Sequence, residues 1–288
     1  MNESLRPLKA YKDPEFINSS AARSVRLLSE YLSPYRRFRQ EKVRDTIVFF
    51  GSARAIPRQM AEKAYQELID AEHGSSCRVD PGQVESARIQ WELSRYYDDA
   101  VELSRLLTSW SLSIARNSHH FVVCSGGGPG IMEAANLGAH LAGGNSVGLN
   151  ISLPLEQLPN PYITPSLNFD FHYFFMRKYW FVYLAKALIV FPGGFGTMDE
   201  LWEVLTLIQT GKITKKMVVL LYGSTYWNEV VNFQAMLRWG TIAPEDIRIF
   251  RFADTPNEAF EIVREGLERY YVRSNRHESP VKKPDVRL

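Results

Sequence analysis

A glycine-rich stretch at residues 191–200, FPGGFGTMDE, constrains the fold of this chain more than any other segment. It follows the apolar run 187–191, which is typical of a buried parallel strand. It precedes residues 201–208, where apolar side chains recur at helical spacing. A strand-to-helix turn rich in glycine lets a ligand approach the backbone, because Cβ atoms are missing there. The glycines of this turn are Gly193, Gly194 and Gly196.

The helix after this turn is expected to begin at Thr197. Its free N–H groups and the positive end of its dipole predict a binding site for a phosphate. Thr197 and Glu200 have the spacing of a capping box, in which Glu200 would bond back to the start of the helix. Glu200 is equally open to interpretation as a catalytic carboxylate, and the local pattern does not decide between the two.

Two further small-residue turns follow predicted strands. Residues 51–54 follow the strand 46–50, and Ser52 and Arg54 there could both contact a phosphate. The loop 125–130 follows the strand 120–124 and begins a helix that extends to about residue 142.

Two common nucleotide fingerprints are absent from the glycine loops. Ile131 and Asp199 occupy the place of the third glycine in G-x-G-x-x-G, and no Gly-Lys-Ser/Thr follows either loop. These loops therefore favour a mononucleotide phosphate over NAD or ATP.

Strands and helices alternate along most of the chain, which predicts an α/β fold. We expect a Rossmann-like three-layer α/β/α architecture with a mainly parallel sheet. Ligands in such sheets bind beyond the carboxyl ends of the strands, where the three turns would converge. The other strands are expected at 146–150, 217–222 and 248–252, and the other helices at 57–72, 86–117, 171–184, 226–238 and 256–270.

Three segments organise the 288 residues. Residues 1–44 form an N-terminal extension with one helix, which begins at 18–20, has Val25, Leu28 and Leu32 on one face and ends at Pro34. Residues 45–271 form a single catalytic domain with a helical insertion at about 57–117. Residues 272–288 form a basic, flexible tail.

Composition excludes some classes of function. No apolar run approaches the ~20 residues of a membrane helix, and there is no signal peptide, so we expect a cytoplasmic protein. The extension carries ten Lys/Arg against five Asp/Glu, but it lacks the interleaved aromatic residues that stack on bases, so a nucleic-acid partner is not favoured. No cluster of His, Cys and Asp indicates a metal, and no cofactor is expected.

The segment 171–184 is predicted to be an aromatic helix, whose rings would pack in the core or against another subunit. Arg177 and Lys178 are two cations within this apolar helix. A buried cation needs a carboxylate or phosphate partner, so both are candidate site residues.

Two of these motifs resemble those of a known family. The pattern Gly-Gly-x-x-Gly-x-Met at 126–132 and the pattern Pro-Gly-Gly-x-Gly-Thr-x-x-Glu at 192–200 are similar to the paired motifs of the "Lonely Guy" (LOG) nucleotide phosphoribohydrolases, often labelled "lysine decarboxylase-like". The resemblance extends from about residue 46 to residue 270. The chain departs from the compact members of the family in its helical insertion and in the Ser-Gly-Gly-Gly-Pro-Gly form of the first loop, a form that larger bacterial members share.

The resemblance implies an activity: hydrolysis of the N-glycosidic bond of a nucleoside 5′-monophosphate, giving a free base and ribose 5-phosphate. It implies Arg177 and Glu200 as the catalytic pair and therefore favours the catalytic interpretation of Glu200. It also implies a homodimer or larger assembly, and neither a metal nor a cofactor. The nucleotide-binding residues that it implies are Ser52, Gly127, Gly128, Gly130, Met132, Lys178, Gly193, Gly194, Gly196 and Thr197.

Two alternatives accompany this hypothesis. A decarboxylase would need a lysine that binds pyridoxal phosphate in a characteristic context, which the chain does not provide. A non-catalytic carrier of a nucleotide or of molybdenum cofactor would use the same fold, but it would not need Arg177 and Glu200. The base remains open among AMP, an N6-prenylated AMP and a broader range of monophosphates.

Overall fold

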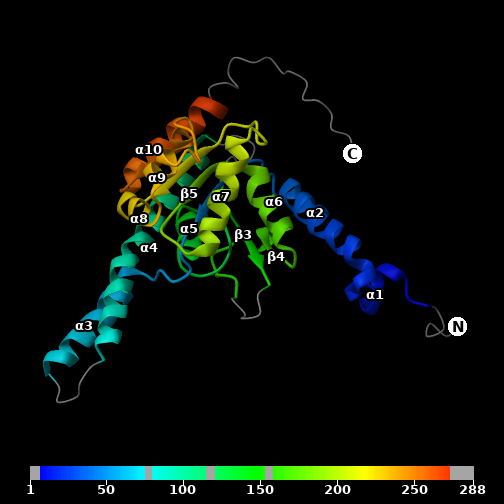
Figure 1. Cartoon of the computed structure of the whole chain (residues 1–288). Helices are drawn as coiled ribbons and strands as arrows, with labels where there is room; N and C mark the ends of the chain where they lie inside the picture. Colours follow the sequence, from blue (N-terminus) through cyan, green and yellow to red (C-terminus); the bar gives the residue numbers. More distant parts are fainter. Residues whose placement is uncertain (1–6, 75–79, 115–120, 153–157, 273–288) are drawn as a thin grey trace.

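The computed structural model describes residues 7–74, 80–114, 121–152 and 158–272 (Figure 1). The predicted basic tail lies outside the described residues, apart from Val272. The strands are β1 Thr46–Phe50, β2 Val122–Ser125, β3 Ser146–Ile151, β4 Asn168–Phe171, β5 Ala185–Val190, β6 Val218–Tyr222 and β7 Phe250–Ala253. The α-helices are α1 Pro14–Asn18, α2 Arg23–Gln40, α3 Arg58–Gly74, α4 Pro81–Ile114, α5 Ile131–Leu141, α6 Phe174–Leu184, α7 Phe195–Gln209, α8 Ser224–Val230, α9 Phe233–Arg238 and α10 Pro256–Leu267.

All seven strands are parallel and form one sheet in the order β4-β3-β2-β1-β5-β6-β7. The predicted α/β fold with a parallel sheet is therefore confirmed. The chain builds the sheet outward from β1 in one direction as far as β4, and β5 then pairs on the other side of β1. This reversal opens a crevice between the carboxyl ends of β1 and β5, the place where ligands bind in such sheets.

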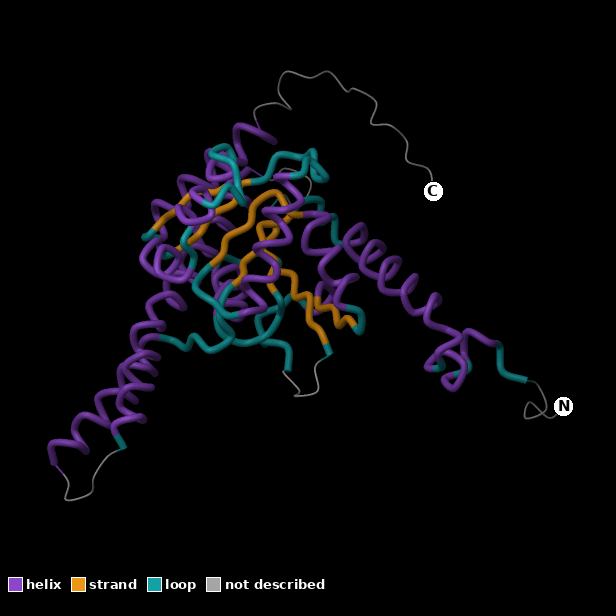
Figure 2. Tube along the Cα trace, viewed as in Figure 1, coloured by secondary structure: helices purple, strands orange, loops and turns teal. Residues whose placement is uncertain are grey.

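Helices cover both faces of the sheet, as Figure 2 shows. Alternate residues of β1 point to opposite faces: Val48 and Phe50 pack with α2, α6, α7 and α9, while Ile47 and Phe49 pack with α4, α5 and α10. Because both faces are buried, the strands contain the continuous apolar runs that the sequence displays.

One strand was missed in the sequence. β4 covers residues 168–171, NFDF, which are only four residues long and include a partly buried asparagine and an exposed aspartate. It pairs with β3 at the edge of the sheet. The aromatic helix α6 consequently begins at Phe174 and not at residue 171. Likewise, the single helix expected at 226–238 is divided into α8 and α9.

The prediction that Pro34 ends the N-terminal helix is wrong, because α2 continues through Pro34 to Gln40. A proline inside a helix leaves the carbonyl four residues earlier without its N–H donor. That carbonyl belongs to Glu30, and the indole Nε1 of Trp180 on α6 donates to it at 3.0 Å. The tertiary contact thus replaces the lost helical bond. The predicted apolar face is exposed on this helix, since Val25, Leu28 and Leu32 are 45%, 59% and 53% accessible.

The predicted insertion consists of α3 and the 34-residue helix α4. One end of this helical pair extends away from the sheet, and α1 with the start of α2 extends from another side (Figure 1). The other end of α4 packs closely on α5: a Cβ added at Gly138 would lie 2.2 Å from the carbonyl oxygen of Val101. None of the described helices combines the length and the apolarity needed to cross a membrane.

Candidate active site

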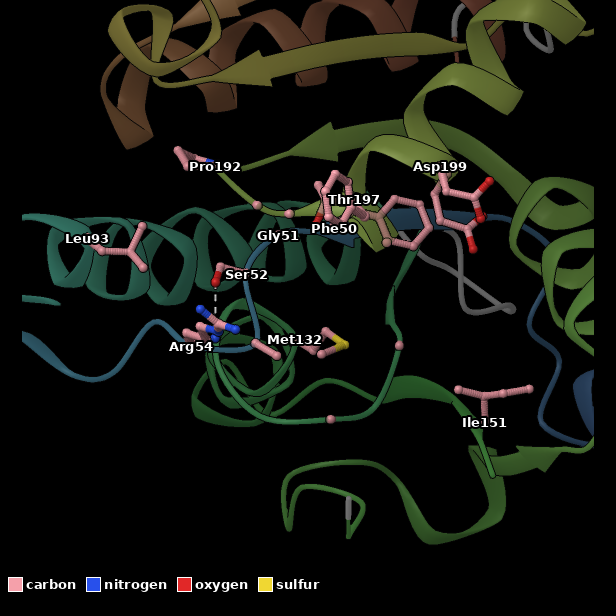
Figure 3. Close-up of a pocket in the computed structure, with 18 of the residues that line it drawn as sticks. Phe50, Gly51, Ser52, Arg54, Leu93, Met132, Ile151, Pro192, Thr197 and Asp199 are labelled. Carbon is pink, nitrogen blue, oxygen red and sulfur yellow. Dashed lines mark hydrogen bonds between the residues drawn. The ribbon is translucent and has the colours of Figure 1, made fainter. Parts of the chain in front are cut away.

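A cavity of about 940 Å³ opens at the carboxyl edge of the sheet, where the strand order reverses (Figure 3). The turn after β1, the two glycine loops, α6, α7 and one face of α4 all contribute to its wall. In the view of Figure 3, Leu93 and Arg54 lie at one end of the cavity, Thr197 lies between, and Asp199 and Ile151 lie at the other end. Of the predicted site residues, those that line it are Ser52, Gly128, Met132, Arg177, Gly193, Gly194, Gly196, Thr197 and Glu200. Gly127, Gly130 and Lys178 do not line it.

The N-terminus of α7 faces this cavity. The helix begins two residues earlier than predicted, with Gly194 as its N-cap, and no side chain caps it. The N–H groups of the first turn therefore have no partner inside the helix. A Cβ added at Gly194 or at Gly196 would meet no atom within 4 Å, so these two glycines leave space on the cavity side of the turn. This arrangement is suited to binding an anion.

Gly193 serves a different purpose in the same turn. A Cβ at this position would lie 2.2 Å from Oγ1 of Thr197, whose side chain is buried. The hydroxyl of Tyr226 on α8 donates to the carbonyl of Gly193 at 2.7 Å. Contacts inside the protein therefore fix the backbone on which the anion site depends.

The other glycine loop is fixed by two left-handed glycines and by hydrogen bonds from Asn160. Gly127 and Gly130 have φ of +77° and +71°, which side chains disfavour. A Cβ at Gly130 would lie 2.3 Å from the carbonyl oxygen of Ser52, and the amide of Asn160 donates to the carbonyls of Gly127 and Gly128 at 3.0 and 3.1 Å. Gly127 and Gly130 therefore shape the loop, while Gly128 faces the cavity.

Arg177 reaches the cavity from α6 but is anchored to the backbone. Its Nε donates to the carbonyl of Leu149 at 2.7 Å and its Nη2 to that of Gly126 at 3.5 Å, while the guanidinium lies 5.0 Å from the centroid of the Phe181 ring. Burial lowers the pKa of Arg177, and the charge of Glu200 opposes that shift. No ion pair within 4.0 Å joins these two described residues, so Arg177 and Glu200 do not contact each other directly.

Lys178, the next residue on α6, turns to α7 instead of the cavity. Its Nζ lies 2.7 Å from Oδ2 of Asp199, 2.9 Å from Oε2 of Glu203 and 3.7 Å from Oε2 of Glu200. Burial lowers the pKa of Lys178, but the three carboxylates together raise it by more than burial lowers it, so the net shift is upward. This predicted nucleotide-binding residue thus does not line the cavity and lies in a cluster of charges with carboxylates of α7.

Glu200 is the acidic residue buried in the cavity wall, with 5% of its surface exposed. It lies six residues after the N-cap Gly194, and Thr197 is not the N-cap, so the capping-box interpretation is wrong. Burial raises the pKa of Glu200 to about 7, although the charges of Lys178 and Arg177 lower it. A carboxyl group with a pKa near neutrality can accept or release a proton at working pH, which is a property of catalytic acids and bases.

Several cavity residues were missed in the sequence. Ser86, Ile89, Gln90 and Leu93 form one face of α4, and the amide of Gln90 donates to the carbonyl of Arg54. Their helical spacing is visible in the sequence, but it does not reveal that this face borders a cavity. Phe195, between Gly194 and Gly196, is 96% exposed. Within the described ranges, no three His, Cys, Asp or Glu side chains come together as a metal site would require.

We predict that two glycine substitutions will separate loop shape from ligand space. Gly130→Ala should lower stability by about 1–3 kcal/mol, because the backbone conformation is unfavourable for alanine and its Cβ meets a carbonyl. Gly194→Ala should lower stability less, by about 1 kcal/mol or below, because alanine is a poorer N-cap than glycine. It should weaken binding of a nucleoside monophosphate, since its Cβ enters the open side of the turn. Thermal denaturation and calorimetric titration measure the two effects. Equal losses of Tm in both variants would contradict this assignment.

The raised pKa of Glu200 predicts a dependence of stability on pH. Between the unfolded value of 4.5 and the folded value of about 7, the folded chain binds more protons than the unfolded chain, so this residue makes stability fall as pH rises. The loss should reach on the order of 3 kcal/mol above pH 7. Glu200→Gln should therefore raise Tm relative to the unmutated chain at pH 8 and much less at pH 5.

Glu229→Gln is the control for this experiment, because Glu229 is exposed on α8. It should leave Tm unchanged at both pH values. A Glu200→Gln variant whose Tm is lowered equally at pH 5 and pH 8 would refute the inferred cost of burying this carboxylate.

Comparison with known proteins identifies relatives along this part of the chain. The model of the family described as "Possible lysine decarboxylase" matches residues 132–263. LOGL2 of Oryza sativa subsp. japonica, named a probable cytokinin riboside 5′-monophosphate phosphoribohydrolase, is 31% identical over 194 residues, covering 65% of this chain and 70% of that protein. Cytokinin riboside 5′-monophosphate phosphoribohydrolase LOG3 of Arabidopsis thaliana is 29% identical over 182 residues, covering 61% of this chain and 78% of that protein.

A solved structure is also similar. The molybdenum cofactor carrier protein of Chlamydomonas reinhardtii aligns with a TM-score of 0.44 and 16% sequence identity, covering 78% of this chain and 99% of that one. The sequence relatives, in contrast, are close enough over enough of their length to assign a family. The chain belongs to the LOG family.

Proposed function

We propose that this chain is an enzyme that hydrolyses the N-glycosidic bond of a nucleoside 5′-monophosphate, with AMP or an N6-modified AMP as substrate. The observation that carries the proposal is that buried Glu200 borders the same cavity as the uncapped N-terminus of α7. The relatives' names, which specify cytokinin riboside 5′-monophosphate, support this class of substrate.

The phosphate would bind at the turn after β5. Free N–H groups of the first turn of α7 and the hydroxyl of Ser52 lie in the cavity wall there. A hydrogen bond to a charged group contributes roughly 1.5–3 kcal/mol. Binding energy from the phosphate, which does not react, would hold the sugar next to Glu200.

Glu200 would act at C1′ of the ribose. The C1′–N bond breaks through a transition state with positive charge on the sugar, and a carboxylate nearby stabilises that charge. The oxygen of a water molecule forms the new bond to C1′, and Glu200 accepts its proton. The departing base takes the bonding electron pair and a proton from solvent, and Glu200 then releases its proton to solvent, so that one water is consumed for each C1′–N bond broken. Arg177 has N–H donors beyond the two that bind backbone carbonyls, and these would hydrogen-bond to the base or a ribose hydroxyl.

A base-release assay tests the proposal directly. AMP should be hydrolysed and adenosine should be a very poor substrate, because adenosine lacks the phosphate. Glu200→Gln should lower kcat by at least ~10² while AMP binding persists, and Glu229→Gln should be unaffected. Wild-type kcat in Glu200→Gln would refute the catalytic assignment. Nucleotide binding without base release by the unmutated chain would instead favour a non-catalytic carrier.

The enzyme is further proposed to act as a homodimer. An apolar surface, which we call the α2–α6 face, carries exposed side chains from both helices: Leu28, Leu32, Phe175, Tyr179 and Tyr183. It is continuous, since the rings of Tyr31 and Tyr179 lie 5.8 Å apart and both helices line one shallow groove. Contiguous exposed apolar surfaces of this kind mark sites of protein association. Because α6 also carries Arg177, a second copy on this face would lie next to the cavity.

The assembly is tested by placing charges on the α2–α6 face. The double substitution Leu28→Glu and Phe175→Glu should convert a dimer to a monomer in light scattering, because two buried charges are costly at an interface. Met60→Glu is the control, since Met60 is equally exposed but lies on α3. A monodisperse monomer of the unmutated chain at micromolar concentration would contradict the proposal.

A further inference from the structure

We propose that Lys178 is a positioning residue that holds Glu200 ionised and in place. The inference rests on the proposed function, because it concerns the same carboxylate. It assigns Lys178 to Glu200 and not, as the motif resemblance implies, to the nucleotide.

The two cations on α6 are consecutive but serve different elements. Arg177 is held by backbone carbonyls of β3 and of the loop after β2. Lys178 has a largely buried side chain, 17% exposed, whose Nζ lies within 4 Å of three carboxylates on α7. Lys178 is therefore the cation that approaches Glu200 within ion-pair distance.

The geometry of α7 makes such a cation necessary. Asp199, Glu200 and Glu203 lie within five consecutive residues, so their carboxylates meet on adjacent turns of one helix and repel one another. Glu200 is buried, and both burial and the neighbouring negative charges oppose its ionisation. One ammonium within 4 Å of all three carboxylates offsets that repulsion and attracts the Glu200 carboxylate towards one position.

Other charged and titratable groups near Glu200 are accounted for. Arg177 acts from α6 by its charge alone, since it makes no ion pair with Glu200. Arg54, after β1, and Tyr226, on α8, line the same cavity, but neither forms an ion pair or hydrogen bond with Glu200 in the described structure. Lys178 is thus the group whose removal should change the ionisation of the Glu200 carboxyl most.

The experiment compares pH profiles of kcat for AMP hydrolysis at saturating substrate, because the phosphate of free AMP itself titrates near pH 6. For the unmutated chain, kcat should fall below about pH 7 as Glu200 is protonated. Lys178→Met keeps the aliphatic stem and removes the charge. It should shift the acidic side of the kcat profile (its acidic limb) to higher pH by about one unit or more. As a result, kcat should fall roughly tenfold at pH 6 and recover towards pH 9. Lys178→Arg should restore much of the original profile.

A second substitution should move the profile the other way. Glu203→Gln removes one negative charge and frees Lys178 to approach Glu200, so the limb should shift to lower pH. Opposite shifts from these two variants would not arise if Lys178 only stabilised the fold or only bound phosphate. A nucleotide-binding role would raise KM without moving the limb.

A direct titration separates this inference from the proposed function. The carboxyl of Glu200, identified in ¹³C NMR spectra by its loss in Glu200→Gln, should titrate at higher pH in Lys178→Met than in the unmutated chain. If base release occurs but neither kcat nor the NMR titration shifts in Lys178→Met, the role of Lys178 is refuted and the proposed function stands. If base release is absent, the function fails, and the NMR shift alone decides whether Lys178 controls the ionisation of Glu200.

Discussion

The structure depends on backbone hydrogen bonds that join three turns through Ser52. The N–H of Ser52 donates to the carbonyl of Pro192 at 2.9 Å, and the N–H of Ile131 donates to the carbonyl of Ser52 at 3.0 Å. The turn after β1 is thereby joined to both glycine loops, at the point between β1 and β5 where the strand order reverses. Main-chain bonds do not depend on side-chain identity, so they fix the spacing of the loops while their side chains remain available for a ligand. Gly130 is required because any Cβ there would separate two of these turns.

Lys178 and the carboxylates of α7 near the cavity are subject to opposing requirements, one from fold stability and one from proton transfer. The raised pKa of Glu200 implies that its buried carboxylate costs stability above neutral pH, and the nearby Lys178 ammonium reduces that cost without removing it. Complete pairing would leave Glu200 with a low pKa and a weak capacity to accept a proton. One ammonium shared among three carboxylates pairs Glu200 only in part, which leaves its pKa between that of an unpaired buried carboxyl and that of a fully paired one.

Much of the fold could be predicted because buried parallel strands leave a strong signal. β1 matches its predicted range, and β5 and β6 differ from theirs by one or two residues at their ends. β4 could not be predicted in the same way, since its four residues at the sheet edge alternate in burial and include polar side chains. The end of the N-terminal helix was predicted wrongly at Pro34 for a different reason. The indole of Trp180, 146 positions away in the chain, supplies the hydrogen bond that the proline removes, and no local pattern reveals this contact.

The candidate site was predicted in part. The glycine loops, Arg177 and Glu200 come together as the motifs indicate. The wall from α4 was missed because a helical stripe does not reveal what it faces. For Lys178, the sequence shows that a buried cation needs a carboxylate or phosphate partner, but not that the nearest anions are Asp199 and Glu203. The local pattern left Glu200 between two interpretations, the motif resemblance favoured catalysis, and the helix start at Gly194 excludes the capping box.

Glu30 gives the N-terminal arm a role that its exposed apolar face does not suggest. Its carbonyl accepts the indole N–H of Trp180, and its carboxylate accepts the backbone N–H groups of His172 and Tyr173 at 2.8 and 3.3 Å. One residue of α2 thus satisfies three donors at and just before α6. The N-terminal helix α2 therefore supports α6, the helix that carries Arg177 and Lys178, from outside the sheet. A chain lacking α2 would leave these three N–H donors exposed to water and α6 free to shift against β3.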